Sequence, residues 1–244
     1  MSERVALVTG GTRNIGLAIA EALGKEGYSL ILTYVRHKRA AEEARARLKD
    51  VAPSVVTVQS DVTSAGAVDH LFKLIADQFG RLDVLVNNVG PFIAKPIAEM
   101  SVDEWHWILD GNLSSAFYCC RAALPLMRQQ GSGHIINIGS LNVELARGAP
   151  NAAAYNAAKA GLVVLTRSLA RSERPYGIRV NMVNPGFIET ENTTDADRES
   201  LPPVIPLRRL GKPEDVAAAV TFLISDKAAY ITGAVINVAG GLWV

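Results

Sequence analysis

The chain has 244 residues, 49% of them hydrophobic, and a formal net charge of +1. That length suits one large α/β domain with a sizeable core, and the near-neutral charge argues against a nucleic-acid or acidic-membrane partner. No apolar run reaches the roughly 18 residues of a membrane span, so no membrane association is expected.

The N-terminus enters a strand pattern directly and lacks the basic start and long apolar core of a signal peptide. The two cysteines, Cys119 and Cys120, are adjacent, and we interpret them as small buried residues in a reducing compartment. The four histidines show no metal-ligand spacing, so no metal is predicted. A cytoplasmic location is expected.

The first predicted strand, residues 5–8, leads into a glycine-rich turn and then a helical apolar pattern from Ile15 to Leu23. This arrangement places backbone N–H groups and a helix N-terminus against a phosphate. The alternative is a tight turn that needs glycine only for its backbone angles. The strand before the turn and the helix after it favour a nucleotide site.

The second predicted strand, residues 28–35, is followed by Arg36 and a helix over 39–50. An acidic residue at this strand end would bind the adenosine ribose and favour NAD, but none is present. Arg36 and Arg13 form a pair that would bind a 2′-phosphate, so the sequence predicts NADP(H). The alternative for this basic stretch is a solvated helix start.

The middle of the chain continues the alternation of strands and helices. The apolar patterns predict strands at 54–59 and 82–86, a helix at 67–80, and one or two helices at 100–130 with a break near Ser101. Asn112 lies within this last segment. A polar amide in a helix is usually exposed or paired, so this residue alone indicates little.

A fifth strand is predicted at 134–138 and ends near Ser140, and a helix rich in small residues is predicted at 152–173. Tyr155 and Lys159 share one face of that helix, because four residues make about one turn. A nearby ammonium favours the phenolate and is expected to lower the pKa of Tyr155, which makes it a proton donor or acceptor. The alternative is an ordinary surface helix.

The last third of the chain is predicted to contain strands at 178–183 and 234–238 and a helix at 213–225. Residues 187–211 lack periodicity, which is typical of a lid or binding loop. The whole chain therefore predicts a single-domain, Rossmann-type, doubly wound sheet of about seven parallel strands with helices on both faces, covering residues 1–244.

Unusual residues fall where the predicted strands end, which is where α/β proteins place ligands. These residues are Gly10, Arg36, Asp61, Asn88, Ser140 and Asn184.

With these motifs in order, the chain resembles the short-chain dehydrogenase/reductase family over nearly its whole length. The family's glycine-rich motif matches residues 9–16, its Asn-Asn-Ala-Gly motif matches residues 87–90, and its Pro-Gly motif matches Pro185-Gly186. The resemblance implies catalytic roles for Asn112, Ser140, Tyr155 and Lys159.

The resemblance also implies that NADPH delivers hydride to a carbonyl that Tyr155 protonates and Ser140 hydrogen-bonds. Lys159 would lower the pKa of Tyr155 and hold the nicotinamide ribose, and Asn112 would position a water leading protons to Lys159. The implied cofactor-binding residues are Gly10, Thr12, Arg13, Asn14, Ile15, Gly16, Arg36, Asp61, Val62, Asn88, Gly90, Tyr155, Lys159, Pro185, Gly186, Ile188 and Thr190.

Three departures from the family pattern stand out. Asn14 replaces a glycine, although asparagine tolerates positive φ. Val89 replaces an alanine and adds bulk near the cofactor. The loop between Ser140 and Tyr155 is about two residues longer than usual, and it borders the substrate.

Within the family the chain is most similar to 3-oxoacyl-acyl-carrier-protein reductases, which implies a 3-oxoacyl thioester carried on acyl carrier protein. An acidic carrier needs basic residues beside the cleft, yet the turn at 129–134 is poorly charged and Tyr176 stands where a base is usual. Arg128, Arg171 and Arg174 are candidate substitutes.

Several alternatives remain open for function and assembly. The substrate alternatives are a small ketone, quinone, sugar or steroid-like carbonyl. A non-catalytic NADP(H)-binding regulator is a further alternative, which the presence of both Tyr155 and Lys159 disfavours. The family implies a homotetramer.

Overall fold

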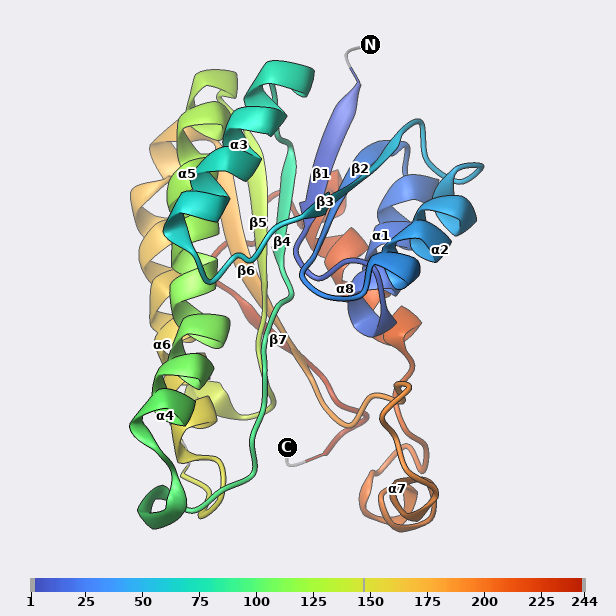
Figure 1. The fold of residues 1–244 in the computed structure, drawn as a ribbon, viewed down its shortest axis with the longest axis vertical. Helices are drawn as coiled ribbons and strands as arrows, with labels where there is room; N and C mark the ends of the chain where they lie inside the picture. Colours follow the sequence, from blue (N-terminus) through green and yellow to red (C-terminus); the bar gives the residue numbers. More distant parts are fainter. Residues whose placement is uncertain (1–2, 147, 243–244) are drawn as a thin grey trace.

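The computed structural model describes residues 3–146 and 148–242, and these build one parallel sheet with helices on both faces (Figure 1). The sheet has seven strands in the order β3-β2-β1-β4-β5-β6-β7, and every neighbouring pair is parallel. The expected fold class is confirmed. The strands are β1 (Arg4–Val8), β2 (Tyr28–Tyr34), β3 (Val55–Gln59), β4 (Val84–Asn87), β5 (Gly133–Ile138), β6 (Ile178–Pro185) and β7 (Val235–Val238).

Helices α1, α2 and α8 lie on one side of the sheet, and α3, α5 and α6 lie on the other (Figure 1). The helices are α1 (Asn14–Lys25), α2 (Lys38–Leu48), α3 (Ala65–Phe79), α4 (Val102–Leu109), α5 (Ser115–Gln130), α6 (Ala153–Ser172), α7 (Asp195–Ser200) and α8 (Pro213–Ile224). Strand side chains alternate between the two cores, as strand geometry requires. Ala6 and Val8 join the α1/α8 core, whereas Val5 and Leu7 join the α3/α5 core.

Cys119 and Cys120 belong to the α3/α5 core, where both are buried and free of disulfides. Burial raises the pKa of both thiols, that of Cys120 to about 12. They pack as small apolar residues, as expected from their adjacency in the sequence.

The segment 100–130 has its break where it was expected and a second irregularity further on. Ser101 caps α4 in a capping box: its side chain accepts from the Glu104 backbone N–H, and the Glu104 carboxylate accepts from the Ser101 backbone N–H. A π-helical segment at Asp110–Ser114 then joins α4 to α5. Segments of this kind are rare and frequent at functional sites, and this one contains Asn112.

The segment 187–211 contains regular structure, which its lack of periodicity in the sequence did not predict. It contains α7 and a 3-10 turn at Pro202–Val204. Thr194 and Asp197 form a capping box that starts α7. Six residues are too few for a helical period to be recognised in the sequence.

The strand order reverses between β1 and β4, and open α/β sheets bind ligands outside the carboxyl strand ends at such a point. The residues predicted at strand ends therefore converge on this edge of the sheet. Among the described residues, no helix is both long and apolar enough to cross a membrane.

Candidate active site

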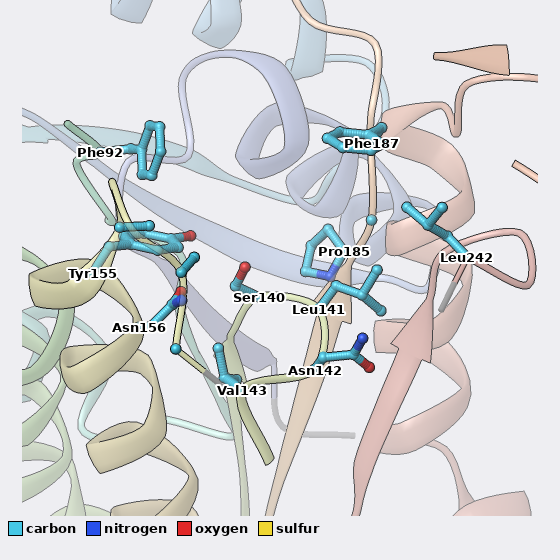
Figure 2. A pocket seen from close by; sticks show the side chains of 14 residues that line it. Phe92, Ser140, Leu141, Asn142, Val143, Tyr155, Asn156, Pro185, Phe187 and Leu242 are labelled. Atoms are coloured by element: carbon cyan, nitrogen blue, oxygen red, sulfur yellow. The ribbon is translucent and has the colours of Figure 1, made fainter. Parts of the chain in front are cut away.

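Ser140, Tyr155 and Lys159 lie close together beside the end of β5. Ser140 follows that strand, whereas Tyr155 and Lys159 lie on successive turns at the start of α6. The Lys159 Nζ lies 5.8 Å from the centre of the Tyr155 ring and donates a 2.7 Å hydrogen bond to the Ile138 carbonyl oxygen. Ser140 hydrogen-bonds the Tyr155 hydroxyl, and both oxygens point into one cavity (Figure 2).

The electrostatics of this group differ from the expectation. Burial raises the pKa of Tyr155, and the hydrogen bond with Ser140 only partly opposes this rise. Lys159 is not among the groups that shift the Tyr155 pKa, and burial lowers the pKa of Lys159 itself to about 7. At neutral pH Tyr155 is therefore protonated, the state that a proton donor requires.

Asn112 is buried in the π-helical segment and presents one polar atom toward Lys159. Its Nδ2 donates to the carbonyl oxygens of Pro91 at 2.8 Å and Ile108 at 2.9 Å. Among the described residues its Oδ1 has no hydrogen-bond partner. A Cβ added at Gly90 would lie 2.8 Å from this Oδ1 and 3.0 Å from the Lys159 Nζ, so both atoms border the same glycine. Only the fold reveals this relationship, because a polar amide in a helix is ambiguous in the sequence.

The glycine-rich loop has the shape that a bound phosphate needs. Gly10 has φ +60, and Asn14 adopts φ 49, so asparagine accepts the left-handed conformation here. A Cβ at Gly16 would lie 2.4 Å from the Gly10 carbonyl oxygen and 2.7 Å from the Asn88 Nδ2, so only glycine fits. Asn88 fastens the loop by donating to the Thr9 carbonyl oxygen at 3.0 Å.

A cavity of about 700 Å³ runs along this loop toward the end of β2. It collects most residues predicted to hold the phosphates, the adenosine and the middle of the cofactor: Gly10, Thr12, Arg13, Asn14, Ile15, Gly16, Arg36, Asp61, Asn88 and Gly90. Val62 is the exception, since its side chain is buried in the α3/α5 core. Trp107 on α4 also lines this cavity and was not predicted from the sequence.

A second cavity of about 620 Å³ continues to the proposed catalytic residues. It is lined by residues predicted to contact the nicotinamide half of the cofactor, namely Tyr155, Lys159, Pro185, Gly186, Ile188 and Thr190. The two cavities form one elongated site, because they share Ile15, Asn88, Gly90, Thr190 and Asn192. The glycine-rich loop in one cavity and the buried Lys159 in the other fit a dinucleotide.

The arginines predicted to hold a 2′-phosphate line a third cavity of about 760 Å³ at the adenosine end. Arg13 and Arg36 both line it, together with Lys38, Arg39 and Arg47. Arg39 is paired with Glu43 at 2.8 Å, and Arg13 with Glu191 at 2.7 Å. Arg36 makes no ion pair with any described residue.

The cavity that receives the Tyr155 and Ser140 hydroxyls has a volume of about 420 Å³ (Figure 2). Apolar side chains from distant segments line it: Phe92, Leu141, Val143, Phe187 and Leu242. None of these was predicted, although Phe92 and Leu242 follow strand-end glycine motifs. The Phe92 ring meets the Tyr155 ring edge-on at 5.1 Å.

The loop after Ser140 forms one wall of this pocket, and Glu144 hydrogen-bonds it to the sheet. A 3-10 turn at Val143–Leu145 is flanked by Asn142 at φ 61 and Ala146 at φ 50, two left-handed residues that are not glycine. The Glu144 carboxylate accepts from the buried Asn184 at 3.0 Å and from Asn237 at 2.8 Å. These bonds link the loop to β6 and β7. Arg147 lies outside the described residues.

The candidate basic residues for a carrier protein lie far from the pocket within one chain. Arg171 is 16 residues beyond Tyr155 on α6, a rise of about 24 Å. Arg128, near the end of α5, pairs with Glu173 at 2.7 Å and stacks on Tyr176. Neither of these nor Arg174 lines the pocket. Among the described residues, no cluster of His, Cys, Asp and Glu could hold a metal ion.

Comparisons with known proteins agree with this geometry. Residues 10–243 match the family model described as enoyl-(acyl carrier protein) reductase. The chain is 41% identical over 243 residues to a 3-oxoacyl-(acyl-carrier-protein) reductase of Synechocystis sp., covering 99% of this chain and 98% of the relative. It is 42% identical over 241 residues to 3-oxoacyl-(acyl-carrier-protein) reductase FabG of Staphylococcus aureus, covering 98% and 97%. A mutant short-chain dehydrogenase/reductase from Serratia marcescens superposes with a TM-score of 0.91 at 34% identity, covering 98% of each chain.

Proposed function

Because the chain belongs to the short-chain dehydrogenase/reductase family, we propose that it uses NADPH to reduce a carbonyl to a secondary alcohol. The observation that carries this proposal is the position of Tyr155 and Ser140, whose hydroxyls point into an apolar pocket that adjoins the dinucleotide-shaped cavity. The cofactor, when bound, supplies the hydride.

The protein's own residues supply the proton and hold the substrate oxygen. Ser140 and Tyr155 hydrogen-bond the carbonyl oxygen, and this orients the carbon for attack. Tyr155, protonated at neutral pH because burial raises its pKa, gives its proton to the oxygen as negative charge develops there. The C=O bond thereby gains one hydride on carbon and one proton on oxygen.

Lys159 and Asn112 replace the proton that Tyr155 gives away. Lys159 has a pKa of about 7, so it exchanges a proton readily near neutral pH. Its bond to the Ile138 carbonyl oxygen fixes it beside the Tyr155 ring. The unpartnered Asn112 Oδ1 is available to accept from a water that leads protons to Lys159.

The proposed choice of NADPH over NADH rests on charge at the adenosine end. Arg13 and Arg36 line one cavity there, and no acidic residue directly follows β2 to bind a ribose hydroxyl. A guanidinium binds a phosphate through paired, charge-assisted hydrogen bonds.

For the substrate we propose a 3-oxoacyl thioester. The curated relatives named above are reductases of this type, and the apolar pocket walls suit an acyl chain. The specific observation that favours another small carbonyl is the absence of charged side chains among the described lining residues. The decisive assay follows NADPH oxidation, and separately NADH oxidation, with acetoacetyl thioester and with a panel of small ketones. Turnover of the ketones alone would exclude the thioester.

We propose that the chain acts as one catalytic domain in which residues 187–211 serve as a lid and which assembles as a cytoplasmic homotetramer. Exposed apolar side chains on α4, α5 and α6 support the assembly, notably Trp107, Phe117 and Val164. Phe222, on α8 at the opposite face of the sheet, is also exposed and offers a second surface for subunit contact. Light scattering of the purified protein measures its molar mass, and a mass four times that of one chain is the expected result for the homotetramer.

A further inference from the structure

Glu191 joins the lid segment 187–211 to the glycine-rich loop. Its carboxylate lies 2.7 Å from the Arg13 Nη1 and accepts a 3.3 Å hydrogen bond from the Asn14 Nδ2. The Glu191 backbone N–H in turn donates to the Asn14 Oδ1 at 3.4 Å. The two hydrogen bonds with Asn14 depend on a departure in the glycine motif, because a glycine at position 14 would have no side chain to reach the lid.

The same glutamate lines the basic cavity at the adenosine end. Two carboxylates, Glu43 and Glu191, are found among its described lining residues. Glu43 is paired with Arg39 at 2.8 Å, whereas Glu191 is paired with Arg13. The chain thus places a negative charge on one of the two arginines that we assign to the 2′-phosphate.

The pair between Arg13 and Glu191 is exchangeable. The side chains are 41% and 45% exposed, and pairs this open to solvent contribute little to stability. A phosphate dianion forms stronger charge-assisted bonds with a guanidinium than a single carboxylate does, and it repels that carboxylate. Arg13 therefore has two competing anionic partners when NADPH binds.

We propose that Glu191 is a specificity-determining residue that competes with the 2′-phosphate of NADPH for Arg13, an inference that rests on the NADPH preference proposed above. NADH lacks this phosphate and leaves the pair intact. Glu191 therefore weakens the binding of NADPH without weakening the binding of NADH, and NADPH binding breaks the Arg13–Glu191 pair between the lid and the glycine-rich loop.

The test measures dissociation constants of NADPH and NADH by fluorescence titration for the wild-type chain and for Glu191→Gln. Glutamine keeps a hydrogen-bonding amide for Asn14 but removes the charge. The expected result is a tightening of NADPH binding by about threefold to tenfold, with NADH binding unchanged within twofold. The difference between variant and wild type should shrink as salt is raised, because the competing charges are exposed.

Glu189→Gln is the matched control. Glu189 lies two residues away on the same lid and pairs with Arg198 at 2.9 Å, so its loss removes the same charge without touching Arg13. An unchanged ratio of NADPH to NADH affinity in Glu191→Gln, or an equal change in the control, would overturn the inference. The proposed NADPH preference fails separately if the wild-type chain binds NADH as tightly as it binds NADPH. The Glu191→Gln ratio still decides the inference in that case.

Discussion

The Lys159 Nζ donates a 2.7 Å hydrogen bond to the carbonyl oxygen of Ile138, the last residue of β5. This bond fixes a buried amine between the end of a central strand and the start of α6. Burial lowers the pKa of Lys159 to about 7, far below its value in an unfolded chain. The lowered pKa links the folding free energy to pH.

We predict that Lys159→Met removes a specific pH dependence of stability. Between pH 7 and about 10 the unfolded chain binds a proton at Lys159 that the folded chain does not, so wild-type stability rises with pH by up to about 1.4 kcal/mol per unit from this group. Below pH 7 Lys159 is protonated in both the folded and the unfolded chain, so this group no longer changes the stability with pH. Urea unfolding of both proteins at pH 7 and pH 9.5 measures the difference. A difference in free energy between variant and wild type that stays constant with pH would contradict the assigned pKa.

Arg36→Ala should weaken NADPH far more than NADH. Loss of a charged hydrogen-bonding partner of the 2′-phosphate costs about 1.5–3 kcal/mol, which is about tenfold to a hundredfold in the dissociation constant. Lys38→Ala serves as the control, because this neighbouring cation lines the same cavity but belongs to the solvated start of α2. Equal weakening of the two cofactors by Arg36→Ala would refute the phosphate assignment.

Glu144→Ala should loosen the pocket loop. The change removes bonds to Asn184 and Asn237 and leaves two left-handed, non-glycine residues without that support. We expect a loss of about 1–3 kcal/mol in unfolding free energy and a severalfold rise in KM for the carbonyl, with NADPH affinity unchanged. Steady-state kinetics and cofactor titration measure both effects. Leu145→Ala, an exposed neighbour, is the control; if it raised KM as much as Glu144→Ala, the loss of these bonds would not be the cause.

Gly16→Ala should abolish cofactor binding, since its Cβ would meet the Gly10 carbonyl oxygen at 2.4 Å and force the loop apart. Gly66→Ala is the matched control: no atom lies within 4 Å of the added methyl group, and the residue is in α3. That change should instead stabilise the fold by about 0.5–1 kcal/mol. Titration calorimetry with NADPH measures cofactor binding by both variants, and thermal unfolding measures the stability of Gly66→Ala. Normal NADPH binding by Gly16→Ala would show that the close packing of this loop is not needed to bind the cofactor.

The fold, and the convergence of residues that line the candidate site, could be predicted from the sequence because both follow from periodic patterns. Strands buried on both faces give continuous apolar runs, and the carboxyl ends of parallel strands meet at one edge. Gly10, Arg36, Asp61, Asn88 and Ser140 therefore converge although they are far apart in the chain.

The features that could not be predicted depend on three-dimensional packing. The π-helical segment that presents Asn112 and the short helix α7 have no sequence period of sufficient length. The direction of the Tyr155 pKa shift depends on burial, which a four-residue spacing does not reveal. Val62 follows a strand end as predicted, yet its side chain turns into the core.

Tyr155→Phe tests the central claim most directly. Phenylalanine keeps the ring that packs on Phe92 at 5.1 Å and removes only the hydroxyl. The proposed mechanism predicts a fall in carbonyl reduction of about 10²- to 10⁴-fold, the usual contribution of a general acid, measured by single-turnover NADPH oxidation with NADPH saturating. A variant that binds NADPH normally and keeps most of its reductase activity would show that Tyr155 is not the proton donor.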